Sequence, residues 1–297
     1  MAEEKRSPRR RLTGVVLWIV AFVLMALVAR HQRRTGPTYP LGVDYALGDA
    51  SVHAELVRSG ETDEAARVRV PPPPDGWAAT LRWRRYPTED DYQGVAFAPG
   101  DDGETWEAPL PVQPAAGKLE YFLIFRRGQE EVRVPPAAAA DPVLRYKDPV
   151  PLGVLLPHIL VMFFSMMVGL RAGFAAALRR PEASRLAWTA LGGLTIGGLV
   201  LGPIAQKYAF GEYWTGWPRG YDLTDNKALI MWLVWLVACV VFGVKGRVRP
   251  RVGRVAVLAA TLVMLVVYLI PHSLRGSELD YDRLDEGVPA DEAIKTG

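Results

Sequence analysis

Two histidines beside apolar stretches are the residues of this sequence best suited to chemistry. His158 lies near the start of the stretch over residues 152–170, and His272 directly follows the stretch over residues 255–270. An ionisable side chain inside hydrocarbon is costly and therefore marks a candidate functional site. Each histidine also has a plain interpretation: His158 could bond a backbone carbonyl, and His272 could simply face water.

Carboxylates lie close to these histidines in the loop 206–227 and in the segment after residue 272. Two imidazoles with carboxylates suit a divalent metal such as zinc, manganese or iron. Two histidines could instead be the axial ligands of haem b. His158 and His272 are thus the candidate cofactor ligands. The candidate metal ligands are His158, His272, Asp222, Asp225, Glu212, Glu278 and Asp280.

The loop 206–227 also carries residues with simpler roles. Trp214 and Trp217 suit the aromatic belt at a membrane surface. Asp225 is placed to cap a helix that starts near residue 228. Asn226 and Lys227 complete the polar set at this position.

Composition and missing motifs exclude several functions. The basic residues behind the net charge of +3 flank apolar stretches, so we expect no nucleic-acid partner. A single cysteine, Cys239, excludes a disulfide framework and a thiolate zinc site. The sequence has no GxSxG, GxxxxGK[ST] or GxGxxG motif, so neither nucleophilic hydrolysis nor nucleotide binding is favoured. Whether the protein is an enzyme stays open.

Five apolar stretches, near the length that spans a membrane, predict five transmembrane helices. Glycines in the third stretch, Gly193 with Gly197 and Gly198 with Gly202, have a spacing that lets helices approach closely. The first stretch could also be a cleaved signal peptide. However, Leu27 is too large for the cleavage site that Ala29 would define, which favours a retained anchor. The five stretches are residues 14–29, 152–170, 186–205, 228–244 and 255–270.

Residues 37–148 have the pattern of an exported all-β domain. Short alternating runs are separated by Pro, Gly and Asp, and in the run 118–125 the odd-numbered apolar residues share one face. This pattern predicts a β-sandwich of the immunoglobulin or fibronectin-III type. Its tryptophans Trp77, Trp83 and Trp106 could bind an envelope protein or a glycan, although core positions would also explain them.

Basic residues in short loops predict the orientation. The connections 171–185 and 245–254 are rich in arginine, which places them in the cytoplasm. The protein is then a multi-pass protein of a bacterial inner membrane, with its N-terminus cytoplasmic and its C-terminus outside. The predicted parts are a basic tail and anchor (1–36), the sandwich (37–148), a four-helix bundle (149–275) with outer loop 206–227, and an acidic outer tail (276–297).

Two long motifs resemble a family of uncharacterised bacterial inner-membrane proteins. The first is WTGWPxGxDLTDNK over residues 214–227, and the second is IPHSxxGSExDY over residues 270–281. The resemblance implies the architecture of an extracytoplasmic β-sandwich with a four-helix membrane unit, and it implies no reaction. Arg219 and Arg275 stand where neutral or apolar residues are expected.

Two functions follow from these observations. One is a polar His/Asp/Glu site on the outer face of the bundle, binding a metal or haem b. The other is a non-enzymatic binding or assembly factor that uses the sandwich to hold a protein or glycan. Transport ranks last, because four bundle helices without an inverted repeat are few for a transporter.

Overall fold

A computed structural model describes residues 8–243, 250–272 and 276–295. Several predicted segments lie partly outside these ranges: residues 1–7 of the basic tail, residue 244 of the fourth stretch, residues 245–249 of the second arginine-rich connection, Ser273 and Arg275 of the second motif, and residues 296–297 of the acidic tail. The chain forms two compact units. The helical unit comprises Met1–Thr35, Val150–Lys207 and Gly216–Leu274, and the β unit comprises Gly36–Pro149, Tyr208–Thr215 and Arg275–Gly297, in each case as far as described.

The described residues contain five helices that are long and apolar enough to cross a membrane, as predicted. One span is a continuous helical run in which the π-helical segment η1 separates α3 from α4. The fourth span begins five residues earlier than the sequence indicated, at Leu223 rather than at 228. The helices are α1 (Pro8–Thr35), α2 (Leu152–Ala177), α3 (Ala183–Leu194), η1 (Thr195–Leu201), α4 (Gly202–Phe210), α5 (Leu223–Phe242) and α6 (Pro250–Leu269).

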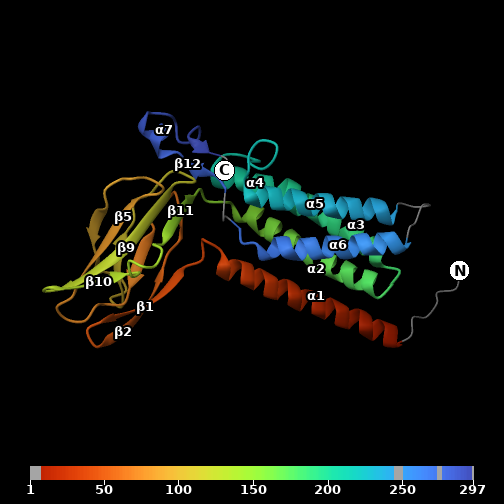
Figure 1. Cartoon of the computed structure of the whole chain (residues 1–297), viewed down its shortest axis with the longest axis horizontal. Helices are drawn as coiled ribbons and strands as arrows, with labels where there is room; N and C mark the ends of the chain where they lie inside the picture. The colour runs from red at the N-terminus through yellow and green to blue at the C-terminus, as the bar shows by residue number, and fades with distance from the viewer. Residues whose placement is uncertain (1–7, 244–249, 273–275, 296–297) are drawn as a thin grey trace. The chain divides into compact units, whose positions relative to one another are not determined.

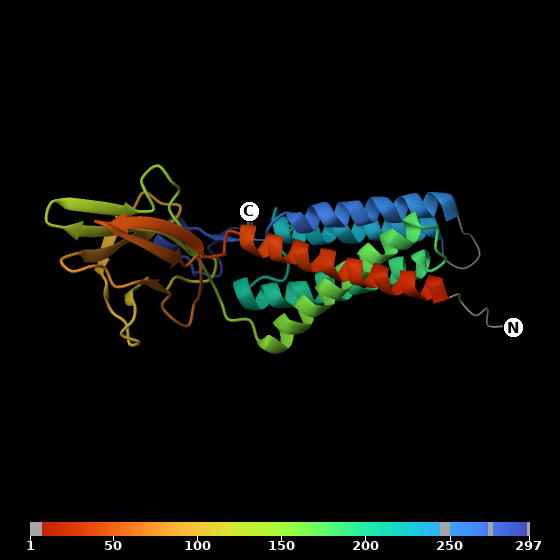
Figure 2. The ribbon, with the colours of Figure 1, turned by 90° about the horizontal axis from the view of Figure 1, so that it is seen from below.

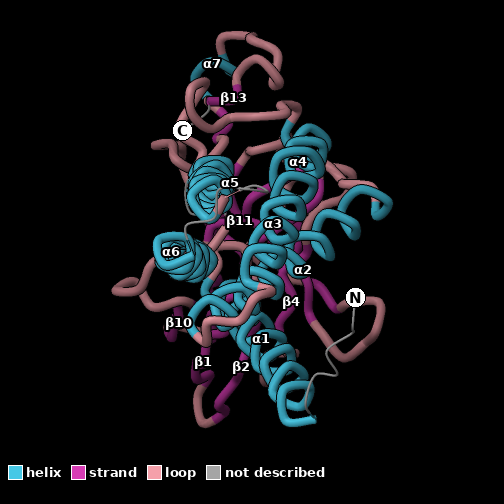
Figure 3. The backbone as a smooth tube through the Cα atoms, turned by 90° about the vertical axis from the view of Figure 1, so that its right-hand side faces the viewer, coloured by secondary structure: helices cyan, strands magenta, loops and turns pink. Residues whose placement is uncertain are grey.

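The helical unit is apolar both inside and on its outer faces. Helix α2 packs against α1, α3 and α6, and α5 packs against α3 and α6 (Figure 3). Met166, Trp235 and Met264 are fully buried between them. Large aliphatic side chains such as Val237 and Leu262 face outward and are exposed. A helix that is apolar all round suits a lipid environment.

Glycines allow the third span to approach α2 closely. A Cβ atom at Gly193 would collide with the hydroxyl of Ser165, and one at Gly197 would lie 2.9 Å from the sulfur of Met162. By contrast, a Cβ at Gly198 would have its nearest neighbours at 3.8 Å. The predicted glycine spacing thus places the contact on the Gly193–Gly197 pair.

The β unit consists of several sheets. The largest has strand order β3-β11-β9-β5-β6 with β10 also paired to β9, and the others are β4-β8-β7, β1-β2 and β12-β13. Figure 1 labels β5, β9, β10 and β11 of the largest sheet together with β1 and β2, and Figure 2 shows the ribbon turned by 90°. The strand pairs of the described residues are antiparallel except that of β3 with β11. The elements are β1 (Leu41–Leu47), β2 (Ala50–Leu56), β3 (Ser59–Glu61), β4 (Arg67–Val70), β5 (Ala78–Arg85), β6 (Gln93–Ala96), β7 (Ala98–Pro99), β8 (Trp106–Pro109), β9 (Lys118–Arg127), β10 (Glu130–Val134), β11 (Val143–Lys147), β12 (Glu278–Leu279), α7 (Tyr281–Asp285) and β13 (Ile294–Lys295).

One apolar core joins strands of different sheets. The predicted inward face of β9 is confirmed, since Leu119, Tyr121, Leu123 and Phe125 are all fully buried. They share a cluster with residues of β1, β2, β4 and β8. Trp77 belongs to this core and is 5 % exposed, which agrees with the core alternative for that residue.

The C-terminal segment folds as part of the β unit. The backbone N–H of Leu279 donates to the carbonyl of Ala116 at 3.2 Å. The hydroxyl of Tyr281 lies 2.9 Å from both the N–H and the carbonyl oxygen of Lys118, so it can accept from one and donate to the other. The segment after the last span is therefore held by specific contacts to the β domain.

Substituting Gly193 by alanine tests the close approach of α3 to α2. The added methyl group has no room beside Ser165, so we expect Gly193→Ala to lower the free energy of unfolding by about 1–3 kcal/mol. Gly192→Ala is the matched control, because a Cβ there meets nothing within 4 Å. Thermal unfolding in detergent micelles compares the two variants, and equal melting temperatures would contradict the packing described.

Candidate functional site

Polar side chains of α1, α2 and α5 lie near the segment that follows α6, at one end of the helical unit. Lys227 of α5 is 4 % exposed. Its Nζ donates to the carbonyl oxygens of Ile270 at 2.8 Å and Pro271 at 3.1 Å, at the end of α6. Carbonyl groups at the C-terminal end of a helix have no N–H donor from a following turn, so the ammonium group of Lys227 donates hydrogen bonds to them. We call this group the histidine–lysine cluster; its members are Gln32, His158, Lys227 and His272.

The neighbours of His272 fix the position of the proton on its ring. Nδ1 lies 3.0 Å from Nε2 of Gln32 and 3.4 Å from Nζ of Lys227. Both neighbouring nitrogens are donors only, and the same Gln32 nitrogen also donates to the carbonyl of Ile270. Nδ1 must therefore accept. His272 is accordingly neutral and carries its proton on Nε2.

His158 has the opposite arrangement. Its Nδ1 lies 2.9 Å from the carbonyl oxygen of Gly197, which can only accept, so Nδ1 carries the proton and Nε2 presents a lone pair. Gly197 belongs to η1, where the N–H of Gly202 also reaches its carbonyl oxygen. His158 and His272 lie near enough to interact electrostatically. Among the hydrogen bonds of the described residues, none joins the two rings directly.

These proton positions do not fit a metal or haem shared by the two histidines. A ligating imidazole normally donates its second N–H to a carbonyl or carboxylate. His158 satisfies this rule, but His272 faces two donors, one of them the cationic Lys227. Moreover, no three His, Cys, Asp or Glu side chains of the described residues are grouped as a metal site would require. The structure therefore supports His158 alone as a ligand-ready imidazole.

The acidic residues of the loop 206–227 serve to build the start of α5. Asp222 is its N-cap, and its carboxylate accepts from the N–H of Thr224 at 2.7 Å and of Asp225 at 3.3 Å. The expectation that Asp225 is the cap was wrong, because the helix begins at Leu223 rather than near 228. Asp225 instead accepts from the N–H of Gly216 at 3.0 Å.

Asn226 holds the same loop by accepting from the N–H of Trp217 at 2.7 Å. The side chain of Trp217 is exposed, and that of Trp214 is half-buried. Glu212 is exposed and, like Trp214, belongs to the β unit.

The remaining two predicted ligands lie in the C-terminal segment of the β unit. Glu278 pairs with the ammonium group of Lys118. Asp280 accepts from the N–H of Arg283 as the N-cap of α7, and it pairs with Lys295 at 2.7 Å. Their partners are thus cations and a helix end within the β unit.

A groove of about 410 Å³ in the β unit is lined by residues of which only Trp83 was singled out from the sequence. It lies where β5 ends and β6 begins, so that two neighbouring strands and the connection between them form its walls. The indole N–H of Trp83 is buried and has no hydrogen-bond partner among the described residues. The signal in the sequence was Trp83 itself, because an aromatic side chain can bind a ligand or pack in the core. The lining residues are Trp83, Arg84, Arg85, Asp90, Asp91, Tyr92, Gln93 and Gln113.

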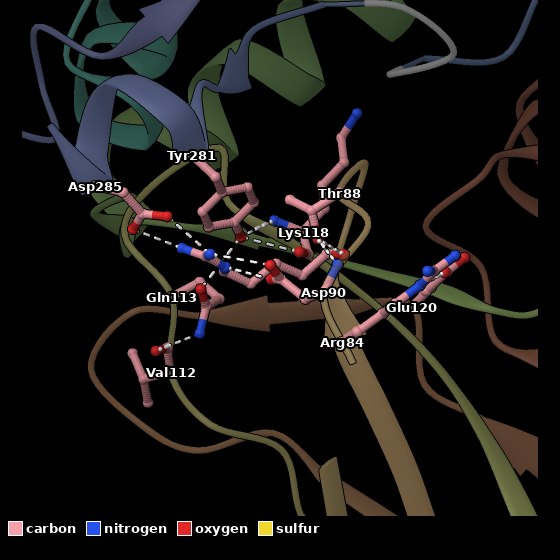
Figure 4. A network of polar contacts seen from close by, with 10 residues as sticks. Arg84, Thr88, Asp90, Val112, Gln113, Lys118, Glu120, Tyr281 and Asp285 are labelled. Carbon is pink, nitrogen blue, oxygen red and sulfur yellow. Dashed lines mark hydrogen bonds and ion pairs between the residues drawn. The ribbon is translucent and has the colours of Figure 1, made fainter. Parts of the chain in front are cut away.

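Arg85 connects the groove to the C-terminal segment. Its guanidinium donates to the carboxylate of Asp90 at 2.6 and 3.2 Å and to that of Asp285 at 2.8 Å twice. It also lies over the ring of Tyr281 at 5.0 Å. The hydroxyl of Tyr281 lies 3.2 Å from the side-chain oxygen of Gln113. Figure 4 shows these two side chains beside each other. The C-terminal segment therefore holds two residues of the groove wall, Arg85 and Gln113.

Charges around the groove shift several pKa values. The hydrogen bond from Arg85 lowers the pKa of Asp90 and also that of Asp285. Burial, followed by the hydrogen bond to Glu120 and its charge, raises the pKa of Tyr92 to about 12. The hydroxyl of Tyr92 lies 2.9 Å from that carboxylate, and Arg84 lies over the Tyr92 ring at 4.8 Å. At neutral pH Asp90 is thus ionised beside Arg85, and Tyr92 keeps its proton.

Comparison of the chain with known protein families, with curated proteins and with solved structures yields no match.

The proton positions in the histidine–lysine cluster predict the outcome of metal analysis. We expect detergent-purified protein to contain no stoichiometric metal held by both histidines and to show no Soret band, because His272 faces two donors. The measurement is elemental analysis with an absorption spectrum. A stoichiometric metal or haem that is lost on both His158→Ala and His272→Ala would overturn the assignment of these protons.

The contacts of Arg85 predict a pH-dependent attachment of the C-terminal segment. Folding lowers the pKa of Asp90 and Asp285. The stabilisation that these carboxylates give to the folded state is therefore complete above the ordinary aspartate pKa of about 3.9. It is lost as the pH falls through the lower folded values. We expect limited pepsin digestion to release the segment only below about pH 4. Asp285→Asn should release it at higher pH, whereas Asp282→Asn, an exposed neighbour, should not; equal release from both would contradict the role of Arg85.

Proposed function

We propose that this protein is a binding component of the bacterial envelope, anchored by five spans in the inner membrane. Its β domain, which we assign to the immunoglobulin or fibronectin-III class of sandwich, binds a glycan in the groove beside Trp83. The observation that carries this proposal is the groove itself, with its aromatic and hydrogen-bonding walls. The assignment to a sandwich is supported by the apolar core that strands of different sheets share.

The chemistry of the groove favours a sugar over other ligands. Trp83 and Tyr92 line the groove, Trp83 also packs against the apolar core, and its buried indole N–H has no partner among the described residues. Asp91 and Gln93 add acceptors and donors that suit paired hydroxyl groups. A volume of about 410 Å³ lies in the range of small-molecule sites. Protein partners, by contrast, generally need a broad contact of about 800 Å² per side.

Folding of the C-terminal segment with the β domain supports the proposed topology. The β domain follows the first span, and the C-terminal segment follows the fifth. Both belong to one compact unit. They must therefore lie on the same side of a membrane. Four of the five candidate spans separate them, and an even number of crossings returns the chain to the same side. The N-terminus then lies on the opposite side, with the arginine-rich connection 171–185.

A second candidate function is proton transfer by His158, in the polar site that the sequence suggested on the helical bundle. The observation in its favour is the lone pair that His158 presents on Nε2 while its Nδ1 is held by Gly197. A single ligand-ready imidazole suits proton transfer better than metal binding. This function ranks behind the first, because the other polar groups of the cluster satisfy helix ends.

Glycan binding is tested with the full-length protein in detergent micelles. A fragment of residues 37–148 would lack the segment that holds Arg85 and Gln113. The probes are oligosaccharides from peptidoglycan and lipopolysaccharide, measured by titration calorimetry. We expect Trp83→Phe to weaken binding about tenfold, because the ring is kept and one donor is lost. Glu89→Gln, in the same connection but outside the groove wall, is the matched control.

Two outcomes of this titration would overturn the proposal. One is the absence of saturable binding to any of the oligosaccharides by the unaltered protein. The other is saturable binding in which Trp83→Phe, Glu89→Gln and the unaltered protein have the same affinity. The ligand would then bind elsewhere.

A further inference from the structure

A second cavity, of about 620 Å³, lies at the other end of the helical unit from the acidic and histidine-bearing loops. It is formed by the first turns of α1, the end of α2 and the start of α3, and α2 packs against both α1 and α3 (Figure 3). Its lining contains five arginines and a single carboxylate, together with apolar residues. The charged residues are Arg11, Arg171, Arg179, Arg180, Arg185 and Glu182.

Arg171 is the central observation. Its side chain is buried, since the residue is only 3 % exposed, and one nitrogen donates to the carboxylate of Glu182 at 3.0 Å. The other two nitrogens, Nε and Nη1, are buried without a hydrogen-bond partner among the described residues, and the guanidinium lies over the ring of Trp18 at 5.6 Å. Unpaired donors on a buried cation are costly. A guanidinium group suits the oxygens of a phosphate, which it can bind through two parallel hydrogen bonds.

Glu182 does not neutralise the cavity. Its carboxylate is shared between Arg171 and Arg180, whose nitrogens lie 3.0 and 3.6 Å away. Burial raises the pKa of Glu182, but hydrogen bonds from its own N–H and from Arg171 outweigh this effect, and the pKa falls. One ionised carboxylate among five arginines leaves a strong excess of positive charge, which an anion would balance.

The backbone at Arg179 points to the same conclusion. Its φ of 52° lies in the left-handed region. The bonds from Arg179 N–H to the carbonyl of Ala176 and from Arg180 N–H to that of Ala175 form the helix-ending motif in which glycine is usual at this position. An arginine here costs free energy that glycine would not. Its presence is accounted for if the side chain contacts a ligand.

The rest of the lining identifies the source of the phosphate. Val15, Trp18, Leu178 and Leu186 give the cavity an apolar portion beside its basic one. The cavity also lies at the ends of helices that are long enough to span a membrane, where headgroups are found. We infer that this cavity binds the phosphate of an anionic phospholipid, with Arg171 as its buried anchor and the apolar residues beside the acyl chains.

The test uses the full-length protein in dodecyl maltoside with three probes: phosphatidylglycerol, phosphatidylcholine and inorganic phosphate. The readouts are the shift in melting temperature and lipid retention in native mass spectrometry. We expect phosphatidylglycerol to bind and to raise the melting temperature more than either other probe. Arg171→Met should weaken this binding by at least about tenfold. Arg219→Met, which removes an exposed arginine of the same unit outside the cavity, should leave it unchanged.

Arg179→Gly separates binding from folding. Glycine relieves the backbone at this position, so the lipid-free melting temperature should equal or exceed that of the unaltered protein, while affinity for phosphatidylglycerol falls. Equal binding of phosphatidylglycerol by Arg171→Met and the unaltered protein would overturn the inference. So would equal effects of the two lipids. If inorganic phosphate alone reproduces the full shift, the ligand is a soluble phosphate and the lipid assignment is wrong.

Discussion

Polar groups at membrane depth need partners within the protein, and this constraint explains most of the candidate residues in the helical unit. Hydrocarbon offers no hydrogen bonds, so each exposed carbonyl or N–H of a helix end must be satisfied internally. Lys227 and Gln32 supply donors to the carbonyls that end α6. Asp222 supplies an acceptor at the start of α5. Asp222, which the sequence presented as a metal ligand, thereby serves as the N-cap of a helix in the bundle.

Buried polar groups without a hydrogen-bond partner among the described residues are costly and need an explanation. Two of them line the cavities described above. One is the indole N–H of Trp83 in the β unit, and the other is the guanidinium of Arg171 in the helical unit. The two cavities differ in charge, since the first mixes arginines with aspartates and the second is strongly basic.

The C-terminal segment gives the β unit a feature that a simple sandwich lacks. Tyr281 bonds the start of β9, and Asp285 holds Arg85 at the end of β5. A chain that returns from the last span to the β domain thus stabilises the wall of the groove. Four candidate spans lie between the two parts of the chain that meet in this wall.

By itself, the sequence determined the classes of structure and their order. Hydrophobic length predicts helices that can span a membrane, because the bilayer sets that length. Alternation over residues 118–125 predicts the buried face of β9, because side chains of a strand alternate. Even the close approach at Gly193 follows from spacing along one helix face. Each of these properties depends on neighbours in sequence.

The tertiary structure alone decided what the polar residues do. Whether Asp222 or Asp225 caps α5 depended on where the helix begins. Because α5 starts five residues earlier than expected, Asp222 is the N-cap and Asp225 accepts from Gly216 instead. The proton on His272 is set by Gln32, which lies 240 positions away in the chain. The groove and the basic cavity are each built by residues from separate elements. Hydrogen bonds and charges act over a few ångströms of space, and no local pattern in the sequence encodes which distant groups fall within that range.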